Sequence, residues 1–147
     1  MATKPFLPLI RELVRCYQVF ESYSSTNIRE LGLTPSQFDI IATLGNTDGM
    51  TSKLLGEKTL ITKGTLTGVV DRLILKDLVR RTQCKYDGRS QIVQLTKKGE
   101  AVFDNVYPAH LSYLSKRFAD IKPEDYARMQ AALQELRIVL EGSAKPD

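Results

Sequence analysis

The stretch VRRTQCKYDGRSQIVQLT, residues 79–96, decides the fold that this sequence predicts. Residues 79–84 and 90–95 are rich in residues that favour strands, and the tip KYDGR contains Asp-Gly, which tolerates the positive φ of a chain reversal. These residues predict a β-hairpin. It directly follows residues 62–78, which open with small polar residues and a lysine and continue with the apolar stripe of a helix. A helix followed by a basic hairpin is the arrangement of a winged helix.

Apolar residues at steps of three and four positions indicate a long first helix that ends at Leu31-Gly32. Because this helix is apolar over much of its circumference, we expect it to pack both within its own domain and against a second chain. Thr34 as N-cap, Pro35 at the first helical position and Gln37 at the third predict a second helix, which should end near Gly45.

Three further helices complete the expected fold, which is mainly α with a small β-hairpin wing. A short one should begin near residue 50, and a long one should run from residue 96 to about residue 118, with a kink or break at Pro108. Lys122-Pro123 signals the last helix. The expected order is four helices, a hairpin and two helices, and 147 residues fit one domain.

Composition argues against several classes of protein. The longest apolar stretches fall short of the roughly 20 residues that span a membrane, and charges interrupt the N-terminal apolar run, so we expect a soluble, cytoplasmic protein. Cys16 and Cys84 lack the spacing of a zinc site or a disulfide framework. His110 is the only histidine, so the sequence lacks the usual histidine ligands of a metal enzyme and offers little for a catalytic triad. We therefore expect neither catalysis nor a cofactor.

Positive charge is concentrated in the middle of the chain. Residues 51–99 contain eleven Lys or Arg and four Asp or Glu, a net charge of +7, whereas the remainder carries −3 of the total of +4. Such a patch is typical of proteins that bind a polyanion, because each cation near a phosphate displaces a condensed counterion. The plain alternative is a solvated surface of mixed charge.

Three segments resemble the MarR family of transcriptional regulators, named for multiple antibiotic resistance. They are LTPSQFDIIATL (33–44), LTGVVDRLILKDLVRR (66–81) and YDGRSQIVQLTKKG (86–99), the last with an Asp-x-Arg wing tip, a strand and Leu-Thr-x-x-Gly. The resemblance runs over most of the chain. It implies a homodimer with intertwined first and last helices, two winged helix-turn-helix lobes and a cleft that often receives a small ligand. The single domain, 1–147, then divides into dimerisation helices, a DNA-binding lobe and a tail: 1–31 and 100–141, 33–99, and 142–147.

Two positions depart from the family pattern. Gly68 stands where members often carry an arginine on the recognition helix, so one expected DNA contact is missing. Asp77 stands where a Lys-Gly pair usually ends that helix, so the turn must form without glycine, at a small local cost.

The N-terminal end of the recognition helix enters the major groove in helix-turn-helix docking. Threonine and lysine there can contact bases or phosphates, and a glycine admits the backbone closely. The candidates are Thr62, Lys63, Gly64, Thr65 and Thr67. Alternatively, Thr62 serves only as an N-cap and the others form a solvated face.

Further DNA contacts are expected from the wing and from the second helix. Arg89 at the wing tip can enter a narrow minor groove, and the resemblance implies that Asp87 orients it. The bland alternative is an exposed arginine paired with Asp87. Ser36 and Gln37 could bind phosphate at the start of the second helix, or they could simply cap it.

A small organic effector is expected at the junction of the first, second and fifth helices, with Tyr17, Phe20, Phe38 and His110 as candidates for its lining. The alternative for His110 is a surface or core residue of the dimer region. The alternative switch is Cys16, because a peroxide-sensing branch of the family uses a first-helix cysteine near tyrosines. A reactive thiol needs an accessible, electropositive setting. The surroundings of Cys16 do not otherwise match that branch, and we expect a buried thiol with a raised pKa.

The combined prediction is a dimeric DNA-binding transcriptional regulator, a repressor that a small organic effector releases from a palindromic operator on double-stranded DNA. One alternative is a winged-helix module for protein assembly that binds no DNA, which the basic centre disfavours. Another is a cysteine- or histidine-dependent enzyme, which the lack of a paired nucleophile and base disfavours.

Overall fold

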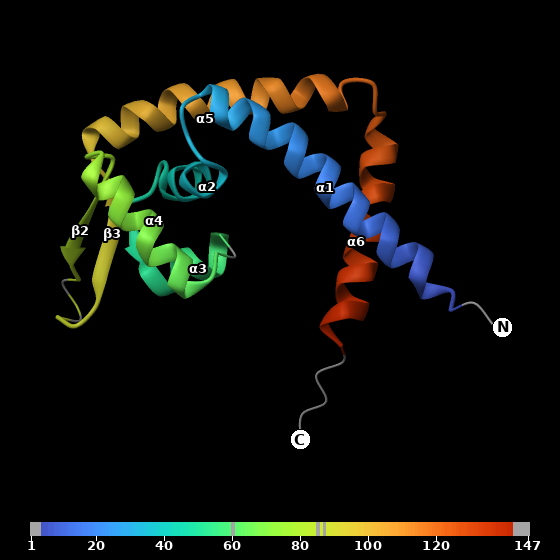
Figure 1. Ribbon diagram of the computed structural model, residues 1–147, viewed down its shortest axis with the longest axis horizontal. Coiled ribbons are helices and arrows are strands. Elements are labelled where there is room, and N and C mark those ends of the chain that lie inside the picture. The colour runs from blue at the N-terminus through green and yellow to red at the C-terminus, as the bar shows by residue number, and fades with distance from the viewer. Residues whose placement is uncertain (1–3, 60, 85, 87, 143–147) are drawn as a thin grey trace. The chain divides into compact units, whose positions relative to one another are not determined.

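The computed structural model describes residues 4–59, 61–84, 86 and 88–142. Within these residues the chain is mainly helical with a small antiparallel sheet, as the sequence predicts (Figure 1). The elements in chain order are α1 (Phe6–Glu30), α2 (Pro35–Leu44), β1 (Met50–Thr51), α3 (Ser52–Thr59), α4 (Lys63–Leu75), β2 (Val79–Gln83), β3 (Gln91–Leu95), α5 (Lys97–Phe118) and α6 (Pro123–Glu141).

The chain forms two compact units, Met1–Tyr113 and Leu114–Asp147. The first contains α1 to α4, the sheet and most of α5. The second contains the end of α5 and all of α6, where Tyr126 donates a hydrogen bond to the Phe118 carbonyl. In the first unit the β2–β3 hairpin lies beside α4 (Figure 1).

The predicted helix boundaries have local physical causes. Gly32 adopts φ +87° after α1, and the Leu33 N–H reaches back to the Ile28 carbonyl, which closes that helix. At α2, Thr34 Oγ1 accepts from the Gln37 N–H while Gln37 Oε1 accepts from the Thr34 N–H, so the predicted capping box is confirmed.

The recognition helix α4 ends without glycine, as the sequence requires. Asp77 adopts φ +59°, and the N–H groups of Asp77 and Leu78 bond to the carbonyls of Ile74 and Leu73. This is the hydrogen-bond pattern of a Schellman motif with aspartate at the left-handed position. The turn therefore forms at the cost of a backbone conformation that glycine would adopt more readily.

Two expectations about the elements need correction. The sheet has a third strand, because β1 pairs with β3 through Met50–Val93 and Thr51–Ile92. The sequence did not predict it, since two residues carry no strand period. Pro108 does not break α5, which continues to Phe118. Buried residues on both sides of Pro108 hold the helix in place: Phe103, Val106 and His110.

The hydrophobic core lies in the lobe that carries the wing. Its fully buried side chains come from α2, α3, α4, β2 and β3: Ile40, Ile41, Leu44, Leu55, Val70, Leu73, Val79 and Val93. By contrast, Ile28 is the only buried residue in the described part of α1, and the described part of α6 has none. The lobe is therefore a packed unit that fixes α4 and the hairpin, whereas α1 and α6 leave apolar side chains exposed.

Candidate nucleic-acid interface and effector cavity

The recognition helix α4 has one buried face and one exposed face. Leu66, Val69, Val70 and Leu73 point into the core. The residues predicted to contact DNA are all exposed at the opposite face of its N-terminal end: Thr62, Lys63, Gly64, Thr65 and Thr67. Thr62 has the backbone of an N-cap, but its hydroxyl donates to Thr65 Oγ1 rather than capping the helix.

The two glycines of α4 are not required by internal packing. A Cβ at Gly64 or at Gly68 would meet no heavy atom within 4 Å. Both residues are exposed, and neither has a positive φ. Glycine weakens a helix by roughly 0.5–1 kcal/mol relative to alanine, and the packing of the protein does not require it here. The absence of side chains at these two positions would allow a ligand to approach the α4 backbone closely.

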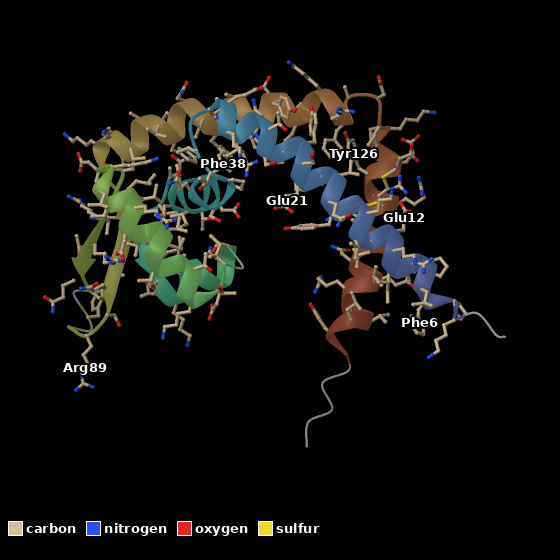
Figure 2. All side chains as sticks on the ribbon, viewed as in Figure 1. Phe6, Glu12, Glu21, Phe38, Arg89 and Tyr126 are labelled. Atoms are coloured by element: carbon tan, nitrogen blue, oxygen red, sulfur yellow. The ribbon has the colours of Figure 1, made fainter. Side chains whose placement is uncertain are left out.

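The wing is a regular antiparallel hairpin. Val79 pairs with Leu95 and Gln83 with Gln91, and Gln83 Nε2 donates to the Gly88 carbonyl at 2.6 Å. Arg89 is exposed and its side chain points away from the lobe at the hairpin tip (Figure 2). Asp87 lies outside the described residues, so its expected role in orienting Arg89 stays a prediction.

An ion pair joins the wing to the recognition helix. Arg81 on β2 donates to Asp71 on α4 at 2.7 Å, and both side chains are partly exposed. Such a pair contributes at most about 1 kcal/mol to stability, but it links the two elements that carry the candidate DNA contacts. Both residues contribute to the net charge of residues 51–99, but the sequence did not predict that they pair.

A groove of about 650 Å³ runs between α3, α4 and β2. Its walls carry three cations, Lys53, Lys63 and Arg81, and one carboxylate, Glu57. Leu66 and Val70 form part of its apolar surface. Lys53 and Arg81 were not among the predicted contacts. A signal for Lys53 was available, because it lies in the first turn of the helix that precedes the recognition helix.

Of the two alternatives for Gln37, capping is the one that its contacts support. Gln37 is buried and its side chain accepts from the Thr34 N–H, so it caps the helix. Ser36 is partly exposed, but it lies on the wall of a cavity beside α1. This cavity, called the α1–α2 cavity below, measures about 350 Å³ and is lined by Tyr17, Phe20, Glu21, Ser24, Ser25, Ile28, Pro35, Ser36, Asp39, Thr59 and Ile61.

The four residues expected to line an effector site divide into two groups. Tyr17 and Phe20 lie on the wall of the α1–α2 cavity. Phe38 and His110 do not, because they pack against each other in the interior, with ring centroids 4.7 Å apart. The expected junction with α5 is therefore filled by side chains, and the cavity opens between α1, α2 and the end of α3 instead.

His110 connects α5 to α1 through two hydrogen bonds. Its Nδ1 lies 2.9 Å from Asn27 Oδ1, and its Nε2 lies 3.1 Å from Ser24 Oγ. An amide oxygen can only accept, so Nδ1 carries the proton of the neutral ring and Nε2 accepts from the Ser24 hydroxyl. Burial lowers the pKa of His110, which favours this neutral form. Ser24 thus links the cavity wall to the buried ring.

The charged groups of the α1–α2 cavity are acidic. Glu21 extends from α1 (Figure 2), and Asp39 extends from α2. Partial desolvation raises the pKa of the Asp39 carboxyl, although the residue keeps an exposed surface.

Cys16 is exposed, which corrects the expectation of a buried thiol. Its Sγ lies 3.6 Å from Glu12 Oε1 on the preceding turn of α1. The hydrogen bond to Glu12 and the negative charge of Glu12 raise the pKa of the thiol. The direction matches the expectation, but its main cause is the neighbouring carboxylate. Cys84 is partly buried just after β2.

No group of three or more metal-binding side chains occurs in the part of the chain that the structure describes. Across the same residues, every helix is too short or too polar to cross a membrane.

An exposed recognition-helix terminus, a basic groove and a projecting hairpin define a winged helix-turn-helix protein. Residues 31–90 match the model of the MarR family. The chain is 27% identical over 123 residues to the transcriptional regulator MhqR of Bacillus subtilis, covering 84% of this chain and 85% of that protein. These matches support a MarR-type winged-helix transcriptional regulator as the class of protein to which this chain is similar.

Solved structures share the fold over almost the whole chain. AbsC of Streptomyces coelicolor, a MarR family transcriptional regulator, superposes with a TM-score of 0.84 at 25% identity, covering 97% of this chain and 99% of that one. BpsR of Bordetella bronchiseptica, whose DNA binding is regulated by 6-hydroxynicotinic acid, superposes with a TM-score of 0.80 at 21% identity, covering 93% and 98%.

Proposed function

We propose that this chain acts as a homodimeric repressor that binds a two-fold operator on double-stranded DNA and is released by a small organic effector. The observation that carries the proposal is the N-terminal end of α4. Its threonines and Lys63 are exposed, its glycines are unobstructed, and the basic groove and Arg89 belong to the same lobe.

The first experiment tests DNA binding itself. A fluorescent duplex, selected by the protein from a random library, is titrated by anisotropy at several salt concentrations. Because phosphate contacts release counterions, log K should fall linearly with log salt, and Lys63→Ala should reduce the slope by about 0.9. Lys116→Ala, which removes an exposed cation on α5, is the matched control and should leave the slope unchanged.

A protein that binds no duplex at low salt would support the assembly-module alternative instead. A slope that Lys63→Ala and Lys116→Ala reduce equally would show that the charge acts diffusely and not through the recognition helix.

Exposed apolar side chains on α1 and α6 support a homodimer. Leu9 on α1 is 51% exposed and Leu133 on α6 is 60% exposed, and each has apolar neighbours on the same helix. Exposed apolar side chains in this number favour burial against a second chain. A symmetric dimer presents two recognition helices, so we expect half-sites about one helical turn apart.

Sedimentation velocity tests the dimer. Leu9→Glu and Leu133→Glu should each shift the protein toward monomer, because each places a charge in the proposed interface. Leu75→Glu is the control: Leu75 is 86% exposed on α4 and should leave the mass unchanged. A monomeric wild type would remove the two-fold operator from the proposal.

The α1–α2 cavity supports effector control. Its volume of about 350 Å³ suits a small organic molecule, and BpsR provides a precedent for regulation of DNA binding by such a ligand. Release requires that the effector bind the two conformations unequally, typically by about 1–3 kcal/mol.

Redox control through Cys16 is the second candidate, and its exposure favours it. The Glu12 carboxylate disfavours it, because a raised pKa reduces the thiolate that reacts. Peroxide should therefore leave operator binding intact in wild type and in Cys16→Ser. If peroxide released the wild type and spared Cys16→Ser, the switch would be the thiol.

A further inference from the structure

The α1–α2 cavity presents negative charge to a ligand. Its lining residues include two carboxylates, Glu21 and Asp39, and no lysine, arginine or histidine. A ligand carboxylate would therefore enter without a cation to pair with and would face two like charges. Like charges a few ångströms apart repel even where solvent weakens the interaction.

Three of the five hydroxyl groups on the cavity wall have already donated their protons, whereas those of Tyr17 and Ser36 have no assigned acceptor among the described residues. Ser24 donates to His110 Nε2, Ser25 to the Ser22 carbonyl at 3.3 Å, and Thr59 to the Leu55 carbonyl at 2.7 Å. A hydroxyl has one proton and two lone pairs. These three oxygens can therefore offer a ligand only acceptor sites.

The N-terminus of α2, which would otherwise attract an anion, is largely used within the protein. Pro35 has no N–H, and the N–H groups of Gln37 and Phe38 bond to the Thr34 hydroxyl and carbonyl. Of the first four amides of the helix, this leaves at most that of Ser36 for a ligand.

The rest of the wall suits an aromatic or aliphatic body. Tyr17 and Phe20 contribute rings, and Ile28 and Ile61 contribute apolar side chains. Aromatic faces attract cations as well as apolar groups. The two carboxylates, the acceptor sites of Ser24, Ser25 and Thr59, and the apolar surface thus favour a molecule that carries N–H donors on an apolar body.

We propose that the α1–α2 cavity binds a small organic cation, an amine with an aromatic body, with Glu21 and Asp39 pairing with its ammonium group. The cavity thereby selects against aromatic carboxylates such as 6-hydroxynicotinic acid, which regulates BpsR. This inference rests on the proposed function in taking the cavity as the effector site, and it names the chemical class of the effector.

Isothermal titration calorimetry on the full chain tests the selectivity with probes of matched shape. Tyramine and 4-hydroxyphenylacetate share a phenol ring and differ in whether the side chain ends in an ammonium or a carboxylate, as do phenethylamine and phenylacetate. Near neutral pH the amines should bind, and the carboxylates should bind on the order of tenfold more weakly or not at all.

Variants locate the binding. Asp39→Asn and Glu21→Gln should each weaken tyramine on the order of tenfold, and both should reduce the discrimination against 4-hydroxyphenylacetate. Glu12→Gln removes a carboxylate from α1 outside the cavity and should leave tyramine binding unchanged. Thermal melts of each variant verify that it folds. Carboxylates that bind as well as amines, amines that fail to bind at millimolar concentration, or cavity variants that behave as wild type would each overturn the inference.

Operator binding by the same preparations separates this inference from the proposed function. A protein that binds its selected duplex but no amine would overturn the choice of ligand and leave the repressor proposal standing. A protein that binds amines in the cavity but no duplex would support the ligand class and overturn the repressor proposal.

Discussion

Replacing Gly64 with alanine should stabilise the protein and weaken its binding to DNA. The added methyl group meets no atom within 4 Å in the folded chain, and the residue lies in α4 with a negative φ. Alanine should therefore increase the free energy of unfolding by up to about 0.5–1 kcal/mol through helix propensity and reduced freedom of the unfolded chain.

The expected loss of DNA affinity has a separate cause. If DNA approaches the backbone of α4 at this position, the methyl group occupies the space that the glycine leaves open. Overpacking of a close contact costs about 1–3 kcal/mol, which corresponds to roughly a 5- to 150-fold weaker complex. The two measurements should thus change in opposite directions, which a general defect in folding cannot produce.

Urea unfolding followed by circular dichroism, at fixed protomer concentration, measures the stability, and anisotropy with the selected duplex measures the affinity. Gly99→Ala is the control for the method. A Cβ at Gly99 would collide with the Leu78 carbonyl, so that variant should be destabilised. An unchanged affinity for Gly64→Ala would refute the close approach of DNA to this part of α4, and a lower stability would refute the open surroundings of Gly64.

Four further predictions concern the wing, the end of α4 and two titrating groups. Arg89→Ala should weaken operator binding by about 1–3 kcal/mol in anisotropy titrations, mainly at A·T-rich flanks, while circular dichroism stays that of wild type. Asp77→Gly should raise the urea midpoint because glycine adopts the observed φ of +59° readily, whereas Asp77→Ala should lower it. His110 has a lowered pKa, so its contribution to stability should be present above the ordinary value of 6.5 and decline as the pH falls through it, a dependence that urea titrations should find reduced in His110→Gln. Asp39 has a raised pKa, so its ionisation costs stability above the ordinary value of 3.8; Asp39→Asn should unfold at higher urea than wild type at neutral pH, and the gain should shrink in acid.

Local chemistry allowed the sequence to determine much of the fold. The capping box at Thr34 and Gln37, the glycine after α1 and the pairing of β2 with β3 are features of neighbouring residues, so their signals lie close together in the sequence. The same holds for the exposed end of α4, because its polar and small residues precede the apolar stripe of a single helix.

The tertiary structure decided what depends on residues far apart in the chain. β1 exists because Met50 and Thr51 find a partner strand some 40 residues later, and α5 passes Pro108 because the surrounding side chains are buried.

The effector cavity changed most between sequence and structure, because a cavity is the space that packing leaves unfilled. Phe38 and His110 have the right chemistry for its wall, but they fill the interior beside it. Glu21 and Asp39 line it instead. They lie on two different helices, α1 and α2, so no local sequence motif indicates that they meet. Which protons its hydroxyl groups retain depends on partners up to 86 positions away, as Ser24 and His110 show. The sequence thus determined where the chain turns and which faces are apolar, and only the packed structure determined which polar groups remain available to a ligand.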